Sequence, residues 1–277
     1  MRSLAAARRS RIRRNDPTGS SRHIREYENQ LVTLFGNYQR TIVQHIEREH
    51  HMGVIEDLAR YDGERDLNTK VPIPPLDLRA LVGALGIAAK AEVLTPGKQV
   101  TDKAVQRAYQ QGTVFAGVTL RRAGLPQAQP VPGGEEVSTL GPADWRTIDW
   151  LKVRNLEVLK GITAETNKQI VFSLTEGINA GEGMLPLAKR ITDAVDTIGI
   201  TRARMMARTE TMYAVNQGSL IRYTQAGVEK VEWLSATEDD RVCEECEALN
   251  GQIFDIDSVP EIPLHVNCRC CTAPVVE

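Results

Sequence analysis

The chain has 277 residues, of which 42% are hydrophobic, so it is long enough and apolar enough for one large domain or two ordinary ones with a substantial core. It contains no apolar run near the ~18 residues that a membrane-spanning helix needs and no secretory signal region, so we expect a soluble protein without a membrane partner. Few aromatic residues and many Ala, Leu, Glu, Arg and Gln favour a mainly α fold.

The formal net charge of −2 conceals a strongly basic N-terminus. Residues 1–25 carry eight arginines against one acidic residue, and we interpret them as a basic flexible arm. Three roles fit this composition: an organellar transit peptide, an arm that contacts nucleic acid, or a solvated tail. No aromatic side chain that could stack on bases is interleaved with the arginines. The candidates for DNA contact are Arg8, Arg9, Arg11, Arg13 and Arg14.

Residues 26–124 form a predicted helical N-terminal region. Apolar residues between Leu31 and Ile46 recur at steps of three and four, which predicts one face of an amphipathic helix. We expect two further helices, separated by Pro96-Gly97, at residues 76–93 and 101–122.

Residues 125–143 are rich in Pro and Gly and are predicted to be a linker or an exposed loop. A long helix should follow, capped by Asp144, with Trp145, Ile148 and Leu151 on its buried stripe. The remaining predicted elements are a short helix at 184–198 that Gly199 ends, a helix at 201–225 and a half-buried strand at 228–235.

All five cysteines lie in the last 35 residues of the chain. Cys243 and Cys246 form one closely spaced pair, and 18 residues with an Asn-Gly turn separate them from the segment that begins at His265. This spacing is typical of two knuckles that close a tetrahedral metal site. We therefore predict structural zinc, held by Cys243, Cys246, His265 and either Cys268 or Cys270, in a knuckle at 243–271.

Two other interpretations of the cysteines remain open. A disulfide would suit an oxidising compartment, although an odd count of five fits a disulfide framework poorly, and reduced thiols could simply fill apolar space. Residues 228–261 carry eleven acidic side chains against two basic ones, so their surface would repel a phosphate backbone. This charge argues against a nuclease that acts at the metal.

The helix at 201–225 carries a second motif. Arg204 and Arg208 are four residues apart and share a helix face, and Glu210 follows closely, so a polar network is geometrically available. An ADP-ribosyltransferase or a metal-dependent nuclease could also use Arg-Thr-Glu with the acidic run 238–240, but the sequence contains no Gly-rich phosphate loop. We therefore predict no enzymatic activity, no catalytic residue and no small-molecule substrate.

The order of the two motifs resembles the C-terminal domain of the phage Mu F-type minor head proteins, also called the phage head morphogenesis family. The matching features are Ala-Arg-Thr-Glu-Thr at 207–211, the strand with Trp233, Cys243-x-x-Cys246, Asn-Gly-Gln-Ile-Phe at 250–254 and His265-x-Asn-Cys-Arg-Cys270. They span about 200–271. The resemblance implies a structural polar framework of Arg204, Arg208, Thr209, Glu210 and Asn216.

From this resemblance we expect a mainly α protein with a small C-terminal α+β module, in which a helical bundle precedes a β-hairpin and zinc-knuckle-like domain. Residues 144–277 would form the Mu F-like head morphogenesis domain, with the cysteine and histidine knuckle at 243–271. The resemblance implies a portal-associated minor capsid protein of a tailed phage, acting in head assembly and in DNA packaging and ejection. Its partners would be the portal protein, the major capsid protein and, through the arm, packaged DNA. It would lie in the virion, in the head interior or at the portal vertex, and in the host cytoplasm during assembly. The alternative functions are a zinc-binding adaptor and a metal-dependent or ADP-ribosyltransferase-like enzyme.

Overall fold

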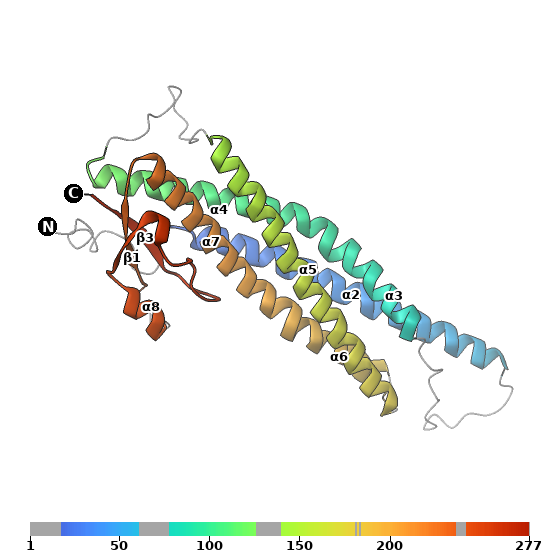
Figure 1. The fold of residues 1–277 in the computed structure, drawn as a ribbon. Coiled ribbons are helices and arrows are strands. Elements are labelled where there is room, and N and C mark those ends of the chain that lie inside the picture. The colour runs from blue at the N-terminus through green and yellow to red at the C-terminus, as the bar shows by residue number, and fades with distance from the viewer. Residues whose placement is uncertain are drawn as a thin grey trace. The chain divides into compact units, whose positions relative to one another are not determined.

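The computed structural model describes residues 18–60, 78–125, 140–180, 182, 184–236 and 242–276. Residues 1–17, with the five candidate DNA contacts, and residues 126–139 of the predicted linker lie outside the described part. The described residues form long helices and one small sheet near the C-terminus (Figure 1). The predicted fold class, mainly α with a small C-terminal α+β module, is confirmed. The helices are α2 (Ser21–Arg60), α3 (Leu78–Ala89), α4 (Thr95–Arg122), α5 (Pro142–Asn179), α6 (Met184–Ala194), α7 (Thr201–Gln225) and α8 (Glu244–Leu249).

The chain divides into two compact units. Each unit combines segments of the predicted helical N-terminal region at 26–124 with segments of the predicted domain at 144–277. Unit 1 contains residues 1–29, 100–155 and 205–277, and unit 2 contains residues 30–99 and 156–204. None of the helices in the described residues is long and apolar enough to cross a membrane.

Unit 1 joins helices to the sheet. Its first core cluster packs Tyr109 of α4, Leu151 of α5 and Val215 of α7 together. A second cluster joins Leu120 and Tyr223 to the sheet. The sheet is antiparallel with the order β2-β1-β3, and its strands are β1 (Lys230–Leu234), β2 (Ile253–Asp255) and β3 (Cys271–Val275). The C-terminal module is therefore built directly onto the helices of its own unit.

Helices α4 and α7 approach each other closely at two glycines. A Cβ atom on Gly112 would lie 2.0 Å from the carbonyl oxygen of Val215, and one on Gly218 would lie 2.4 Å from the carbonyl oxygen of Tyr109. The hydroxyl of Ser219 donates to the carbonyl of Gly112 at 3.0 Å. Backbone atoms thus meet backbone atoms, which leaves no flexible group to move aside.

We expect Gly112→Ala to lower the free energy of unfolding by about 3 kcal/mol, because the added methyl group must push two helices apart. The matched control is Gly161→Ala on α5, where an added Cβ would have no atom within 4 Å. That control should be neutral or stabilising by about 0.5–1 kcal/mol, because alanine is the better helix former. Urea unfolding of both variants measures the difference. Equal stabilities would contradict the close approach.

In unit 2, the apolar stripe of α2 is buried as the sequence predicts, with Leu31, Phe35 and Ile42 fully covered. Two predicted helix ends in this unit are wrong. The chain stays helical through Pro96-Gly97, because a π-helical turn at Lys90–Leu94 joins α3 directly to α4. It stays helical through Gly199, because a π-helical turn at Val195–Ile200 joins α6 directly to α7.

The π-turns explain why these residues do not break the helices. The backbone N–H of Thr95 bonds the carbonyl of Lys90, five residues back, so the ladder widens just before the proline that cannot donate. Gly199 is needed for space, since a Cβ there would lie 2.7 Å from the Phe35 ring. A Cβ atom on Gly97 would likewise lie 2.5 Å from the Leu159 side chain.

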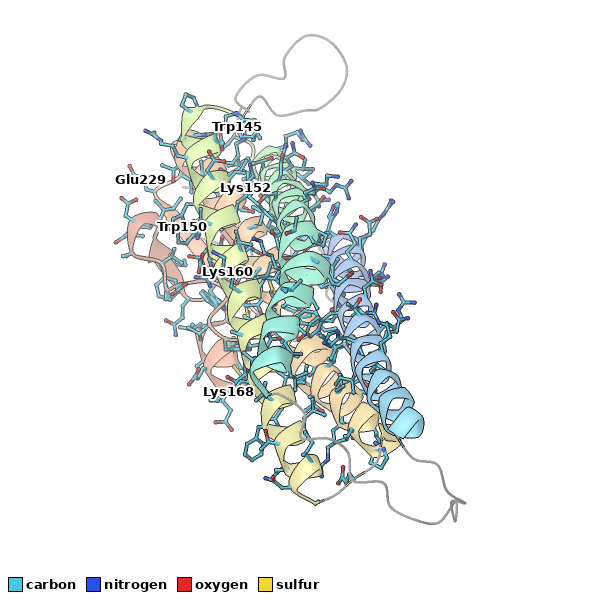
Figure 2. The ribbon with its side chains drawn as sticks, turned by 90° about the vertical axis from the view of Figure 1, so that its right-hand side faces the viewer. Trp145, Trp150, Lys152, Lys160, Lys168 and Glu229 are labelled. Atoms are coloured by element: carbon cyan, nitrogen blue, oxygen red, sulfur yellow. The ribbon has the colours of Figure 1, made fainter. Side chains whose placement is uncertain are left out.

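The start of α5 also differs from the prediction. The helix begins at Pro142, and Asp144 lies inside the first turn, where its carboxylate accepts from the backbone N–H of Gly141 and from the hydroxyl of Tyr109, both at 2.7 Å. Asp144 thereby occupies the buried face of this turn. Trp145, predicted on that face, is 43% exposed and projects outward (Figure 2).

Candidate metal centre

The first knuckle is built by the start of α8. Cys243 is the N-cap residue of this helix, and its sulfur accepts a hydrogen bond from the backbone N–H of Cys246 at 3.4 Å. This bond lowers the pKa of the Cys243 thiol. One turn of helix brings the Cys246 sulfur to the same side, where it is buried. The spacing of two residues between the cysteines is therefore what a helix N-terminus needs to present both sulfurs.

The second knuckle is a turn between His265 and Cys268. The N–H of Cys268 bonds the carbonyl of His265 at 3.1 Å, and Asn267 adopts a positive φ of 64°. The hydroxyl of Thr209 on α7 accepts from the N–H of Asn267 at 3.1 Å and so ties the turn to the helix. Asparagine tolerates this left-handed conformation better than most residues.

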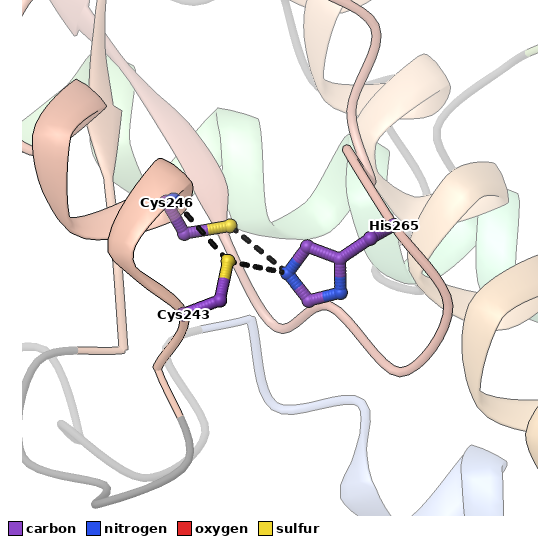
Figure 3. A group of neighbouring side chains, drawn as sticks. All are labelled: Cys243, Cys246 and His265. Atoms are coloured by element: carbon purple, nitrogen blue, oxygen red, sulfur yellow. Dashed lines mark hydrogen bonds between the residues drawn. The ribbon is translucent and has the colours of Figure 1, made fainter.

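His265 points between the two sulfurs of the first knuckle (Figure 3). Its Nε2 lies 3.2 Å from the Cys243 sulfur and 3.1 Å from the Cys246 sulfur. Its Nδ1 lies 2.8 Å from the carbonyl oxygen of Val266, and this contact raises the pKa of the imidazole. A proton on Nδ1 leaves the Nε2 lone pair free, which is the arrangement that a metal-binding histidine requires.

The remaining thiols extend the donor set. The sulfur of Cys246 lies 3.8 Å from that of Cys268, and Cys246, Cys268 and Cys270 form a second group of close donors. The Cys268 pKa falls to about 5 because Cys270 donates a hydrogen bond to it, whereas burial raises the pKa of Cys246 to about 12. Cys271 lies apart, in a separate cluster with Phe115 and Leu234.

The donors form two groups that share Cys246, one with Cys243 and His265 and one with Cys268 and Cys270. With sulfur ligands about 2.3 Å and nitrogen ligands about 2.0 Å from zinc, the edges of the tetrahedron are roughly 3.5–3.8 Å. The separation of 3.8 Å between the Cys246 and Cys268 sulfurs agrees with such an edge, and the nitrogen–sulfur separations of 3.1–3.2 Å are shorter. The donors line a cavity of about 10 Å³, which has room for one small occupant. The cluster can hold a metal ion.

The polar residues predicted on α7 have different partners among the described residues. Glu210 is buried, and its carboxylate pairs with Arg154 of α5 through two bonds of 3.0 and 3.3 Å, with Asn155 donating a third at 3.3 Å. Arg208 instead lies 3.7 Å from Glu28, and Arg204 is exposed. Sequence reasoning missed Arg154 and Asn155 because the pair bridges elements more than 50 residues apart, which no local spacing reveals.

Thr209 and Asn216 have a different role from Glu210. Both connect α7 to the cysteine segment, Thr209 through Asn267 and Asn216 through a bond of 3.2 Å from its amide to the carbonyl of Cys270. Ser235, which follows β1, donates to the carbonyl of Cys246. These contacts fix the backbone on which the metal donors stand.

Comparison with known proteins agrees with this arrangement. Residues 168–273 match the family described as Phage Mu protein F like protein. Over these residues the chain is similar to the Mu F-like family. The Mu F-like region thus begins earlier than the predicted stretch at 200–271 and takes in the end of α5, all of α6 and α7, and the metal centre.

One relative is an uncharacterized protein of Methanocaldococcus jannaschii, which is 32% identical over 134 residues. The alignment covers 48% of this chain and 21% of the relative, so the chain spans only a small part of that protein's length. No solved structure matches the chain. The Mu F-like match indicates a phage head morphogenesis protein.

Proposed function

We propose that this protein is a minor head protein of a tailed phage that associates with the portal and acts as a structural component in head assembly and in DNA packaging and ejection. The observation that carries the proposal is the Mu F-like match over residues 168–273. It falls on a region whose polar and sulfur groups are used to hold the module together. Glu210, the most conspicuous acid of the motif, is buried against Arg154, which supports a structural role and no catalysis.

We further propose that the metal is zinc and that its role is structural. Thiolate and imidazole donors suit zinc, and four protein ligands would leave no position for a reacting water. Cys243, Cys246, His265 and Cys268 would hold it. The ion would join α8 to the turn that precedes β3. The chain between them contains short strand β2, one 3₁₀ turn at Ile256–Ser258 and irregular segments.

The proposed partners are the portal protein and the major capsid protein, with packaged DNA reached by the basic arm. The protein would lie in the virion, in the head interior or at the portal vertex, after a stage in the host cytoplasm. Replacing Arg8, Arg9, Arg11, Arg13 and Arg14 with alanine should reduce the slope of log affinity for DNA against log salt concentration by about 0.9 for each phosphate that the arm no longer neutralises. An unchanged slope would contradict the arm's proposed role in binding DNA.

Portal association can be tested by co-purification. Tagged portal rings isolated from phage-producing cells should retain the chain after nuclease treatment, since protein contacts rather than shared DNA would hold it. The variant with the five arginines replaced is the matched control and should be retained equally well. Recovery of the chain with the major capsid protein alone would contradict the portal as its partner.

A further inference from the structure

The link between α8 and β2 is a tight turn that contains the one Asn-Gly pair of the sequence. Asn250 has φ −59° and ψ 120°, and Gly251 has φ 82°. The N–H of Gln252 bonds the carbonyl of Leu249 at 3.0 Å, which closes a type II turn. Asn-Gly is the asparagine pair most prone to deamidation, because glycine has no side chain to hinder its backbone nitrogen from attacking the neighbouring amide.

Deamidation at such a pair needs only water. The backbone nitrogen of Gly251 attacks the side-chain carbon Cγ of Asn250, and a C–N bond forms. The proton of that nitrogen passes through water to the side-chain amino group, which leaves as ammonia when the succinimide ring closes. Water then opens the ring to aspartate or to isoaspartate. The ring has five members, so the attacking nitrogen must lie on the Cβ side of Asn250, at a ψ of about −120°, which L residues rarely adopt.

The folded turn holds both reacting groups away from this geometry. The Gly251 nitrogen donates to the carbonyl of Trp233 at 2.8 Å, and Oδ1 of Asn250 accepts from the backbone N–H of Ser235 at 3.1 Å. The ψ of 120° at Asn250 is far from the value that ring closure needs. Asn250 and Gly251 are only half-buried, so the bonds to β1 and to the residue that follows it protect the amide, rather than exclusion of water.

We propose that Asn250 is a deamidation site gated by this turn: its amide stays intact while the turn is bonded to Trp233 and Ser235, and it is lost when the turn opens. Isoaspartate adds one carbon atom to the main chain between residues 250 and 251. The Gly251 bond to the Trp233 carbonyl and the Trp233 bond to the Gln252 carbonyl, 2.8 and 2.9 Å in the folded turn, then cannot both form again. The modification thereby makes a transient opening permanent. It depends neither on the proposed metal nor on the proposed role in the phage head.

Hydrogen exchange provides a quantitative test, because exchange of the Gly251 amide and deamidation of Asn250 both need the same nitrogen to leave the Trp233 carbonyl. We expect deamidation in the folded full chain to be at least about tenfold slower than in the urea-unfolded chain, and to be slowed by the same factor as amide exchange at Gly251. Mass spectrometry of the peptide that contains Asn250 measures the first rate, and NMR measures the second. Deamidation of the folded protein at the unfolded rate, or slowing that differs widely from the Gly251 protection, would overturn the proposal.

Two variants of Ser235 separate its N–H from its hydroxyl. Ser235→Pro removes the N–H that holds the Asn250 oxygen and should speed deamidation of the folded protein. Ser235→Ala keeps this N–H and should deamidate as slowly as the wild type. Equal rates in the two variants would contradict protection by this bond. The comparison of deamidation with Gly251 exchange in the wild type tests the gate independently of how well the proline variant folds.

The consequence of the modification has its own control. Asn250→Asp introduces the negative charge without the extra main-chain carbon, and its carboxylate can still accept from the Ser235 N–H. We expect Gly251 to keep its protection in this variant and to lose it in protein that carries isoaspartate at position 250. Equal protection of Gly251 in the isoaspartate form and in the unmodified protein would show that the turn closes again, which would contradict a permanent opening.

Discussion

Arg154→Ala should lower the free energy of unfolding by about 3 kcal/mol, because it leaves the Glu210 carboxylate buried without its counter-charge. The Glu210 side chain is only 5% exposed, so water cannot replace the guanidinium. The substitution also takes the guanidinium away from the Tyr213 ring, whose centre lies 4.5 Å from it. Urea unfolding measures the change.

Substitution of the other member of this pair should lower the free energy of unfolding by less. Glu210→Gln keeps a hydrogen-bonding side chain beside Asn155, and the Arg154 side chain, 34% exposed, can still reach water. We expect a loss of about 1 kcal/mol. The matched control is Lys152→Ala on the same helix, whose pair with the exposed Asp149 at 3.2 Å should contribute less than about 0.5 kcal/mol. Equal effects of Arg154→Ala and Lys152→Ala would contradict the buried pair.

Removal of the proposed zinc should unfold the cysteine module and spare the long helices. Structural zinc contributes on the order of 10 kcal/mol of binding free energy, which is far more than a module with one short helix and three strands can replace. The loss should be greatest between Val242 and Cys270. Parts of β1 and β3 should persist, since Val231 packs against α4 and α7, and the hydroxyl of Tyr223 donates to the carbonyl of Thr272.

Hydrogen exchange with and without a chelator measures which segments unfold when the metal is removed. Trp233 offers a second readout, because it is buried against Cys246, Cys268 and Cys270. Replacing the two exposed tryptophans, Trp145 and Trp150, with phenylalanine would make its fluorescence specific. Cys246→Ala should behave like the chelated protein, and Cys271→Ala should not. Protection retained across 242–270 in metal-free protein would contradict a structural metal.

Local patterns in the sequence predict the elements better than they predict the element ends. The stripe of α2 follows from apolar spacing, and its buried residues agree with it. Pro96 and Gly199 mislead because the rules for them assume an α-helical ladder. A π-turn changes the ladder, and the residues that make a glycine necessary, Phe35 for Gly199 and Leu159 for Gly97, are distant in the chain.

Local patterns also predict only part of the candidate site. Cys243, Cys246 and His265 can be predicted because the first pair is set by one helix turn and His265 by one tight turn, which are local structures. The choice between Cys268 and Cys270 cannot be predicted from spacing. Cys270 is contacted by Ser235, which follows β1, and by Asn216 of α7, both far from it in the chain. The partner of Glu210 cannot be predicted from spacing either, because Arg154 lies on another helix, α5.

The most direct test of the proposed role is to count this chain in purified phage particles by quantitative mass spectrometry, normalised to the portal ring, in full heads and in heads that have released their DNA. We predict a few copies per portal ring in full heads, and a change in that number after release if the chain leaves with the DNA. Absence from both kinds of particle would contradict a minor head protein and would favour a factor that acts only during assembly or a zinc-binding adaptor outside the virion.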